Sequence, residues 1–345
     1  MEQKLTIGVI HWDCALPKKT TFFGYHATKS LSPAKYRNIT PYYADILSEH
    51  EIDYHVRTVE EYETELQYAI DCGIDYFAYC RYGDTKETKI RPHKEDFGNV
   101  SDKVWELAAA RKLHMKSGLK EKIKLCAILP GHPMLESELD ELAEIMEENF
   151  YQKIDGKPLV YVFNEYDTEK IAQMKKACKK RGFAPHIAII ASEPKPTAGK
   201  DYSETDSVCA YACIAENVTS YDEMSNELMR CNEVRKGYGV DVIPFYSVGW
   251  NPSPRIDNIV PWIQYPEVSY APLATEEELL SGAKKLVDWM KENQDVIHTN
   301  HIMTFAWNEF EEGGHICPTY GEDGKIDLSR LEAFGKVVKY WKENL

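Results

Sequence analysis

The segment His301-Ile-Met-Thr-Phe-Ala306 is a short apolar run that passes directly into the polar stretch Trp307-Asn-Glu-Phe-Glu-Glu-Gly-Gly314. A continuous apolar run is typical of a parallel strand that is covered on both faces. The same pattern recurs on the amino-terminal side of this segment. We count eight candidate strands in all, at residues 5–10, 75–80, 124–129, 158–163, 186–191, 207–212, 241–247 and 301–306.

Helical patterns separate most of these runs. Thr58-Val-Glu-Glu61 is a capping box, and it opens an apolar stripe that ends near Gly73. Thr275-Glu-Glu-Glu278 is a second capping box, and Gly182 is placed to terminate another helix. The expected helices cover residues 59–72, 101–116, 136–149, 168–181, 220–236, 276–293 and 328–344, whereas residues 193–206 after the fifth strand predict a loop.

Alternating strands and helices in this number predict a (β/α)8 barrel, with residues 1–345 forming a single catalytic domain. An open, doubly wound sheet would account for six of the strands and leave two unexplained. The nucleotide-binding form of that sheet also lacks motif support, because no GxGxxG or GxxxxGK[ST] sequence follows any of the expected strands.

Composition narrows the choice of partners. The chain is 43% hydrophobic and 28% charged, with a formal net charge of −15, which disfavours binding to nucleic acid or to an anionic membrane surface. The amino-terminal residues do not resemble a signal peptide, and the sequence has no uncharged apolar stretch of about 18 residues. Nine scattered cysteines without a CxxC pair favour a reducing compartment. We therefore expect a cytoplasmic protein; its oligomeric state is left open.

The residues that follow the strands should line the active site, because barrel enzymes carry it at the carboxyl ends of their strands. These positions are rich in Trp, Tyr, His, Asn and carboxylates, the mixture that binds the apolar faces and the hydroxyls of sugars. We therefore expect an oligosaccharide or glycoside as substrate. The predicted substrate-binding residues are His11, Trp12, Tyr79, Arg81, His132, Trp250, Asn251, Arg255, Trp307 and Asn308.

The acidic loop after the last strand provides the candidate catalytic residues. Glycoside hydrolysis requires two carboxyl groups, one protonated and one ionised, and crowding acids in a partly buried site separates their pKa values. Glu309 and Glu312 can both point inward, whereas Glu311 is expected to face away. Glu165, after the fourth strand, is a reserve carboxylate.

Four stretches of the chain resemble the WbsX-type proteins, which are related to the endo-α-mannosidase and endo-mannanase barrels of glycoside hydrolase family 99. Residues 305–319 are similar to the signature W-N-E-W-x-E-G-x-x-x-E-P, and residues 247–255 to the segment G-W-D-N-T-P-R. Residues 65–82 and 155–161 carry weaker matches. The resemblance implies a (β/α)8 barrel that cleaves α-mannosidic bonds with retention of configuration. By position, it implies that Glu309 acts together with the substrate's 2-hydroxyl group and that Glu312 is the acid/base.

The chain departs from this signature at Phe310, Asn251 and Cys317, where the related sequences have Trp, Asp and often Glu. Since the acid pair is retained, a metal-free and cofactor-free glycoside hydrolase is the leading hypothesis. A glycosyltransferase is the first alternative, but it would need clustered Lys or Arg residues or a metal-binding DxD motif. The second alternative is a carbohydrate-binding barrel without catalytic activity. Whether Glu309 and Glu312 converge on one pocket distinguishes this alternative from an enzyme. A metal site at His11, Asp13 and His132 has no supporting motif.

Overall fold

Parallel strands form a closed ring in the computed structural model, which describes residues 4–13, 22–53, 58–81, 109–131, 134–163, 167–191, 196–321 and 324–345. In ring order, the strands are β1 (Thr6–His11), β4 (Tyr76–Cys80), β5 (Lys124–Leu129), β7 (Lys157–Phe163), β8 (His186–Ile190), β9 (Ser207–Cys209), β10 (Asp241–Val242) with β11 (Phe245–Ser247), and β12 (His301–Phe305). Each of the eight predicted strands coincides with one of these positions.

The ring closes through its seventh strand, which is divided into β10 and β11. β10 pairs with β9 on one side, and β11 pairs with β12 on the other. Only Ile243 and Pro244 separate the two parts, and they continue the pairing. The Ile243 N–H donates to the carbonyl of Val208, and the Met303 N–H donates to the carbonyl of Pro244, both at 2.9 Å. Proline cannot donate to a ladder, so the pairing changes sides at this residue. This closure confirms the (β/α)8 barrel.

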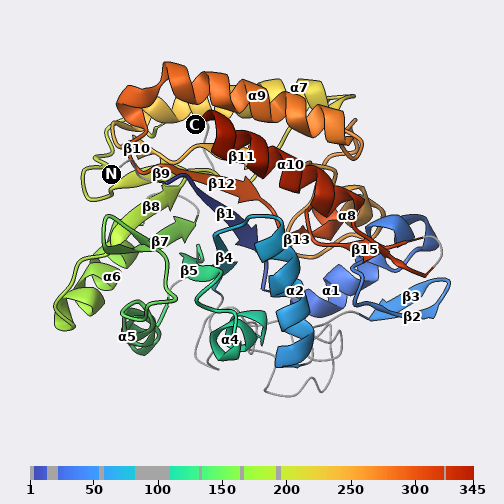
Figure 1. The fold of residues 1–345 in the computed structure, drawn as a ribbon, viewed down its shortest axis with the longest axis horizontal. Helices are drawn as coiled ribbons and strands as arrows, with labels where there is room; N and C mark the ends of the chain where they lie inside the picture. The colour runs from blue at the N-terminus through green and yellow to red at the C-terminus, as the bar shows by residue number, and fades with distance from the viewer. Residues whose placement is uncertain are drawn as a thin grey trace.

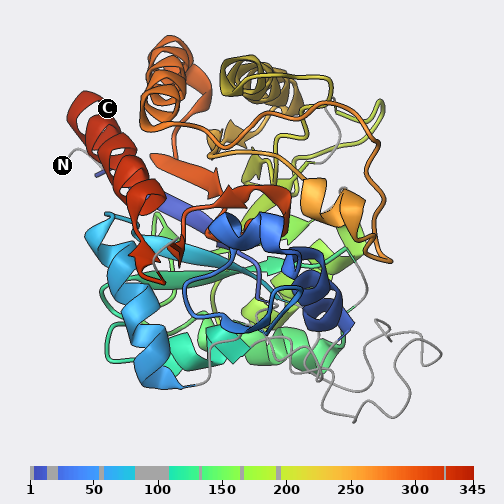
Figure 2. The ribbon, with the colours of Figure 1, turned by 90° about the vertical axis from the view of Figure 1, so that its right-hand side faces the viewer.

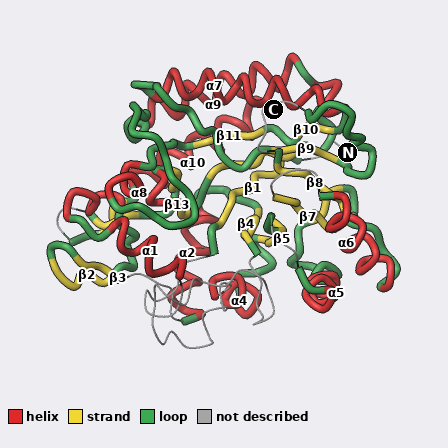
Figure 3. The backbone as a smooth tube through the Cα atoms, turned by 180° about the vertical axis from the view of Figure 1, so that it is seen from behind, coloured by secondary structure: helices red, strands yellow, loops and turns green. Residues whose placement is uncertain are grey.

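Helices surround the ring (Figures 1 and 3). The main ones are α2 (Val59–Asp71), α4 (Ala109–Lys116), α5 (Glu136–Ile145), α6 (Thr168–Lys180), α7 (Tyr221–Arg235), α9 (Glu276–Glu292) and α10 (Ser329–Asn344). Thr58 and Thr275 cap α2 and α9 as predicted, and Gly182 has a φ of 88° just beyond α6. The described part of the segment after β8, residues 196–206, contains no helix, also as predicted.

The alternation of side chains along β4 separates the inside of the barrel from its helical layer. The hydroxyl of Tyr76 lies 2.9 Å from that of Tyr161 on β7, although β5 stands between the two strands, so both side chains point into the ring. Successive side chains of a strand point to opposite faces. Tyr76, Ala78 and Cys80 therefore face inward, and Phe77 and Tyr79 face the helices. This alternation determines which residues at the strand ends point into the barrel mouth.

Two insertions at the barrel mouth were not predicted. After β1, the chain forms α1 (Phe22–Leu31), the 3-10 helix η1 (Ala34–Ile39) and a hairpin of β2 (Asp45–Ser48) and β3 (Glu51–Asp53). After β11, it forms the short helix α8 (Ser253–Asp257) and then an extended loop up to α9, visible in Figure 2. Both α1 and α8 pack against the turn that carries the acidic residues.

The described ranges also bear on the expectations about membranes and disulfides. None of the helices in the described ranges is long and apolar enough to cross a membrane. The eight cysteines that these ranges include are free thiols, and seven of them are buried.

Candidate active site

The acidic loop folds into a small hairpin at the end of β12. β13 (Asn308–Glu309) pairs with β14 (Gly314–His315), and the 3-10 turn η5 (Phe310–Glu312) connects them. Gly313 has a φ of 68°, the left-handed region that favours glycine. At Gly314, a Cβ atom would lie 2.0 Å from the ring of Phe305. The two glycines therefore let the hairpin close tightly, and its acidic side chains become buried.

Three carboxyl groups of this hairpin converge on one arginine. Arg255 of α8 contacts Glu312 through Nη1, and its Nη2 lies 3.5 Å from Glu309 Oε2 and 3.4 Å from Glu311 Oε1. All four residues are buried. The expected convergence of Glu309 and Glu312 is present. The expectation that Glu311 faces away is wrong, because its side chain is 0% exposed and shares the same guanidinium group.

Burial and neighbouring charges shift the pKa values of this cluster. Burial raises the pKa of Glu309 well above its usual value of 4.5, and Glu312 raises it further, while Arg255 and Tyr211 oppose the shift. Burial also raises the pKa of Glu311, against the effect of Arg255. Burial lowers the pKa of Arg255, but Glu312, Glu311 and Glu309 more than offset this effect. A buried carboxylate without a partner is energetically unfavourable. Burial therefore favours the protonated form of some of these carboxyl groups.

Two tyrosines complete the hydrogen bonds of the acid pair. Tyr211, which follows β9, donates to Glu309 Oε1 at 2.6 Å. Tyr265, in the loop after α8, donates to Glu312 Oε1 at 2.5 Å, the oxygen that also accepts from Arg255. Tyr211 follows β9, whereas Tyr265 lies in the loop after α8, so two different segments of the chain hold the two acids.

Aromatic rings enclose the guanidinium group of Arg255. Its Cζ lies 5.3 Å from the ring centroid of Trp12 and 5.6 Å from that of Trp262, within the range of cation–π contacts. Trp250 packs against Tyr265 and Phe305, with ring centroids 5.6 and 5.7 Å apart. Trp12, Trp250 and Arg255 therefore gather at the acid hairpin, and their contact with a substrate stays a prediction.

Asn308 and Asn251 support the backbone of the site. The amide of Asn308 accepts from the Trp12 N–H and donates to the Trp12 carbonyl, both at 2.7 Å. The Asn251 N–H donates to the Glu312 carbonyl at 2.7 Å, and its side chain bonds Ser253 and Ala271. These contacts join the β1 and β11 ends to the hairpin. A substrate contact by either asparagine stays a prediction.

His11, Tyr79 and Trp307 do not lie at the mouth, which corrects three of the predicted substrate contacts. Their side chains join a buried network against α2 and α4. His11 Nε2 lies 3.2 Å from Glu65 Oε1, which also accepts from Trp307 Nε1 at 2.7 Å, and the Tyr79 hydroxyl lies 2.9 Å from His114 Nδ1. Burial lowers the pKa of His114 to about 3, so the imidazole is neutral.

Strand alternation is the physical reason for the correction at His11 and Tyr79. Trp12 points to the hairpin, so its neighbour His11 faces the opposite side, and Tyr79 alternates with the inward Cys80 in the same way. Trp307 lies beyond the end of β12, where alternation no longer applies.

Arg81 also faces the helical layer. Its Nη2 lies 3.0 Å from Glu141 Oε2 on α5, and its position next to the inward Cys80 accounts for this direction. The prediction that Arg81 lines the mouth is therefore wrong. His132 and the reserve acid Glu165 lie outside the described residues. Asp13, weighed as a metal ligand, accepts from the Ala110 N–H at 3.1 Å. The described ranges contain no group of three or more His, Cys, Asp or Glu residues that could hold a metal ion.

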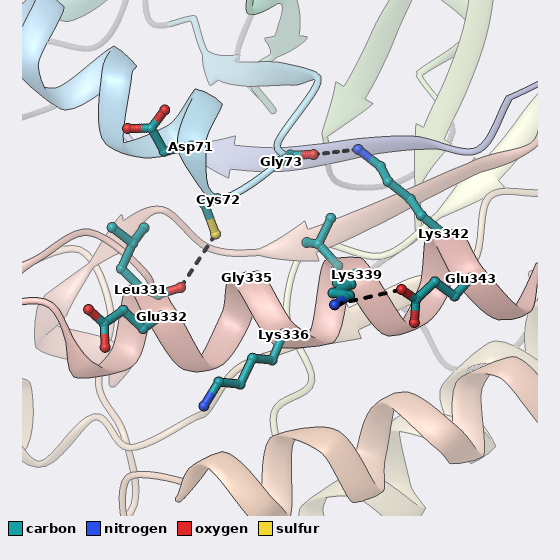
Figure 4. A pocket seen from close by; sticks show the side chains of 11 residues that line it. Asp71, Cys72, Gly73, Leu331, Glu332, Gly335, Lys336, Lys339, Lys342 and Glu343 are labelled. Carbon is teal, nitrogen blue, oxygen red and sulfur yellow. Dashed lines mark hydrogen bonds and ion pairs between the residues drawn. The ribbon is translucent and has the colours of Figure 1, made fainter.

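A groove of about 670 Å³ lies between the end of α2 and the face of α10 (Figure 4). Lys342 crosses it and donates to the Gly73 carbonyl at 2.7 Å. Asp71, Cys72 and Gly73 directly precede β4, so this groove lies at the amino ends of the strands, opposite the acid hairpin. The predicted opening of Glu309 and Glu312 into a pocket at the carboxyl end stays a prediction.

Sequence reasoning missed Tyr211, Trp262, Tyr265 and the burial of Glu311. Tyr211 falls inside the predicted sixth strand, which in the structure ends at Cys209, and this placement concealed it. Trp262 and Tyr265 lie in a loop with no regular period. The aromatic content of that loop was the only available signal.

Some proteins of known structure share this barrel architecture. The chain is similar in fold to an endo-α-mannosidase. Two structures of the glycoside hydrolase family 99 endo-α-mannosidase from Bacteroides thetaiotaomicron, one of them in complex with bis-tris propane, align with TM-scores of 0.58 and 0.57. They are 13% and 12% identical in sequence, and each alignment covers 98% of this chain and 96% of the other. No known family profile and no curated protein matches the sequence. The similarity supports a family 99-like barrel fold.

Proposed function

We propose that this chain is a retaining glycoside hydrolase that cleaves an α-linked hexoside of the mannoside type, with Glu309 and Glu312 as its two carboxyl groups. The observation that carries the proposal is their convergence on Arg255 from unequal surroundings. Residues 1–345 would act as one catalytic domain without a metal or cofactor. The sequence resemblance and the fold shared with an endo-α-mannosidase support the mannoside type.

The contacts of the two acids support a division of labour. Glu309 is desolvated and its pKa is raised, so it is suited to hold a proton. Glu312 accepts from Arg255 and Tyr265, donors that stabilise an ionised carboxylate. In this scheme, Glu309 gives its proton to the leaving oxygen, and Glu312 acts at the anomeric carbon or takes a proton from the attacking hydroxyl. The sequence resemblance implies the opposite assignment of the two roles. Cleavage rates of substrates with different leaving groups distinguish the two assignments.

Substrate binding at the mouth would use the aromatic and polar side chains gathered there. Trp12 and Trp250 would offer apolar surface to a sugar ring, with Asn251, Asn308 and Arg255 beside them. His11, Tyr79, Arg81 and Trp307 are excluded from this proposal because they face α2, α4 and α5.

The alternatives have less support. A glycosyltransferase would need basic side chains for a diphosphate, yet Arg81 pairs with Glu141 and Arg255 with three glutamates. A purely binding barrel does not require two acids to share one guanidinium group. A hydrolase accounts for both the pairing and the burial of these acids.

The proposal can be tested by incubating the purified protein with a panel of aryl α- and β-glycosides and manno-oligosaccharides, with and without EDTA. We expect cleavage of an α-mannoside that persists in EDTA and needs no nucleotide sugar. Cleavage that depends on a divalent ion, or transfer from a nucleotide sugar without hydrolysis, would contradict it.

A further inference from the structure

The guanidinium group of Arg330, in the first turn of α10, binds main-chain carbonyls of separate segments at the barrel mouth. In the acid hairpin, its Nε donates to the carbonyl of His315 at 2.5 Å, and its Nη2 donates to that of Gly313 at 3.4 Å. After β11, Nη2 also donates to the carbonyl of Val248 at 2.6 Å. One side chain therefore joins the hairpin to the end of β11.

The chemistry of this side chain makes the connection strong. Burial lowers the pKa of Arg330 to about 10, so the group is still charged at neutral pH. A charged, planar guanidinium group donates in fixed directions, and each of its hydrogen bonds is stronger than one between neutral groups. Its Nη1 reaches a third segment, before α9, at the carbonyl of Ala274, 3.5 Å away. Arg330 therefore constrains the relative positions of the segments that it joins.

Two of these segments supply an acid and the cation that it contacts. Glu312 precedes Gly313 in the hairpin, and Arg255 follows on α8, just beyond the β11 end. The two backbones touch, because a Cβ atom at Gly249 would lie 2.6 Å from the Gly313 carbonyl oxygen. The Asn251 N–H also donates to the Glu312 carbonyl at 2.7 Å. A shift of the hairpin relative to the β11 end would therefore separate Glu312 from Arg255 Nη1.

We propose that Arg330 is a positioning residue, which holds the acid hairpin against the end of β11 and so keeps Glu309 and Glu312 in contact with Arg255. This inference rests on the proposed function, in which the two glutamates carry the chemistry, and it holds whichever of them is the acid. Arg330 acts through the backbone of the hairpin. Its loss would displace the two acids without changing them chemically, so kcat should be affected more than KM.

The first test is a kinetic comparison at a temperature far below the melting temperature of each variant. A catalytic group misplaced by about 1 Å can cost about 100-fold in rate, so kcat of Arg330→Met should fall by about 10–100-fold, with a smaller change in KM. Lys342→Met is the matched control. Lys342 is also a cation of α10 that donates to a main-chain carbonyl, that of Gly73, but at the opposite end of the barrel. Its kcat should stay at the wild-type value.

The second test is a double-mutant cycle, which needs no substrate. If Arg330 holds the hairpin where Arg255 can bind it, Arg255 contributes less stability once Arg330 is lost. The variant that combines Arg255→Met with Arg330→Met should therefore lose less in melting temperature than the sum of the two single losses. Repulsion between the two cations would give the opposite sign. When Lys342→Met replaces Arg330→Met in the cycle, the losses should add.

The two tests separate this inference from the proposed function. Coupled losses of stability in a protein that cleaves no glycoside would overturn the proposed function alone. Additive losses, a combined loss larger than the sum, or a wild-type kcat in Arg330→Met would overturn the role of Arg330. If Arg330→Met does not fold, Arg330→Lys keeps the charge but loses the planar group, and the same two measurements apply to it.

Discussion

Replacing Arg255 by methionine tests whether the acid cluster depends on this one cation. Removing one partner of a buried ion pair costs about 3–5 kcal/mol, because the remaining charge stays buried. At about 2.1 cal/mol/K per residue, a chain of 345 residues has an unfolding entropy of about 0.7 kcal/mol/K. The melting temperature at neutral pH should therefore fall by about 4–7 °C, as measured by calorimetry.

The pH dependence of this loss identifies its cause. The folded-state pKa values of Glu309 and Glu311 are raised above 4.5, so the stability they contribute is fully present below that pH and is lost as the pH rises through the raised values. Arg255 opposes both shifts, and without it the loss with rising pH should be steeper. The melting temperature of Arg255→Met should thus approach that of the wild type at pH 4.5 and fall below it toward pH 7.

Arg235→Met provides the matched control. Arg235 is equally buried but donates to the carbonyls of Cys209, Cys231 and Ala191, which do not titrate. Because Arg235 contacts no carboxylate, its loss of stability should change less between pH 4.5 and pH 7 than that of Arg255→Met. If the Arg255→Met loss were the same at both pH values, packing against Trp12 and Trp262 would explain it, and the electrostatic reasoning would be refuted.

Two further substitutions test the hairpin and the acid pair. Gly314→Ala should lower stability by about 1–3 kcal/mol and reduce activity, because its Cβ would overlap the Phe305 ring, whereas Gly335→Ala in α10, whose nearest contact is 3.8 Å away, should be neutral or stabilising in thermal unfolding. Tyr265→Phe removes a donor to Glu312 worth about 1.5–3 kcal/mol, so kcat/KM should fall by about 10–100-fold; an unchanged kcat/KM would mean that this hydrogen bond is not used in catalysis.

The barrel could be predicted from the sequence because its signals are local. Each strand is a continuous apolar run, and the capping boxes at Thr58 and Thr275 mark the helix starts correctly. The division of the seventh strand at Pro244 could also have been expected, since proline interrupts a ladder. The insertion at residues 22–53 was not predicted, because its short elements have no clear period.

The candidate site could be predicted only in part, because position at a strand end does not specify direction. Trp12 and His11 are adjacent, yet only Trp12 reaches the acid hairpin. Which residues at a strand end point into the barrel depends on the register of that strand. Pairing with the neighbouring strands establishes this register. Glu311 was misassigned for a related reason: a turn of η5 packed under α1 and α8 buries a residue that an open loop would expose.

The most direct measurement of the central claim is the cleavage rate of an α-mannosyl oligosaccharide and of its activated aryl glycoside by wild type, Glu309→Gln and Glu312→Gln. General acid/base assistance contributes about 10²–10⁴ in rate, so each variant should lose that much on the oligosaccharide. Glu309→Gln should recover on the aryl glycoside, which needs little protonation, and Glu312→Gln should not. Recovery by Glu312→Gln instead would support the assignment that the resemblance implies. Wild-type rates for both variants would contradict the claim that these two glutamates carry the chemistry.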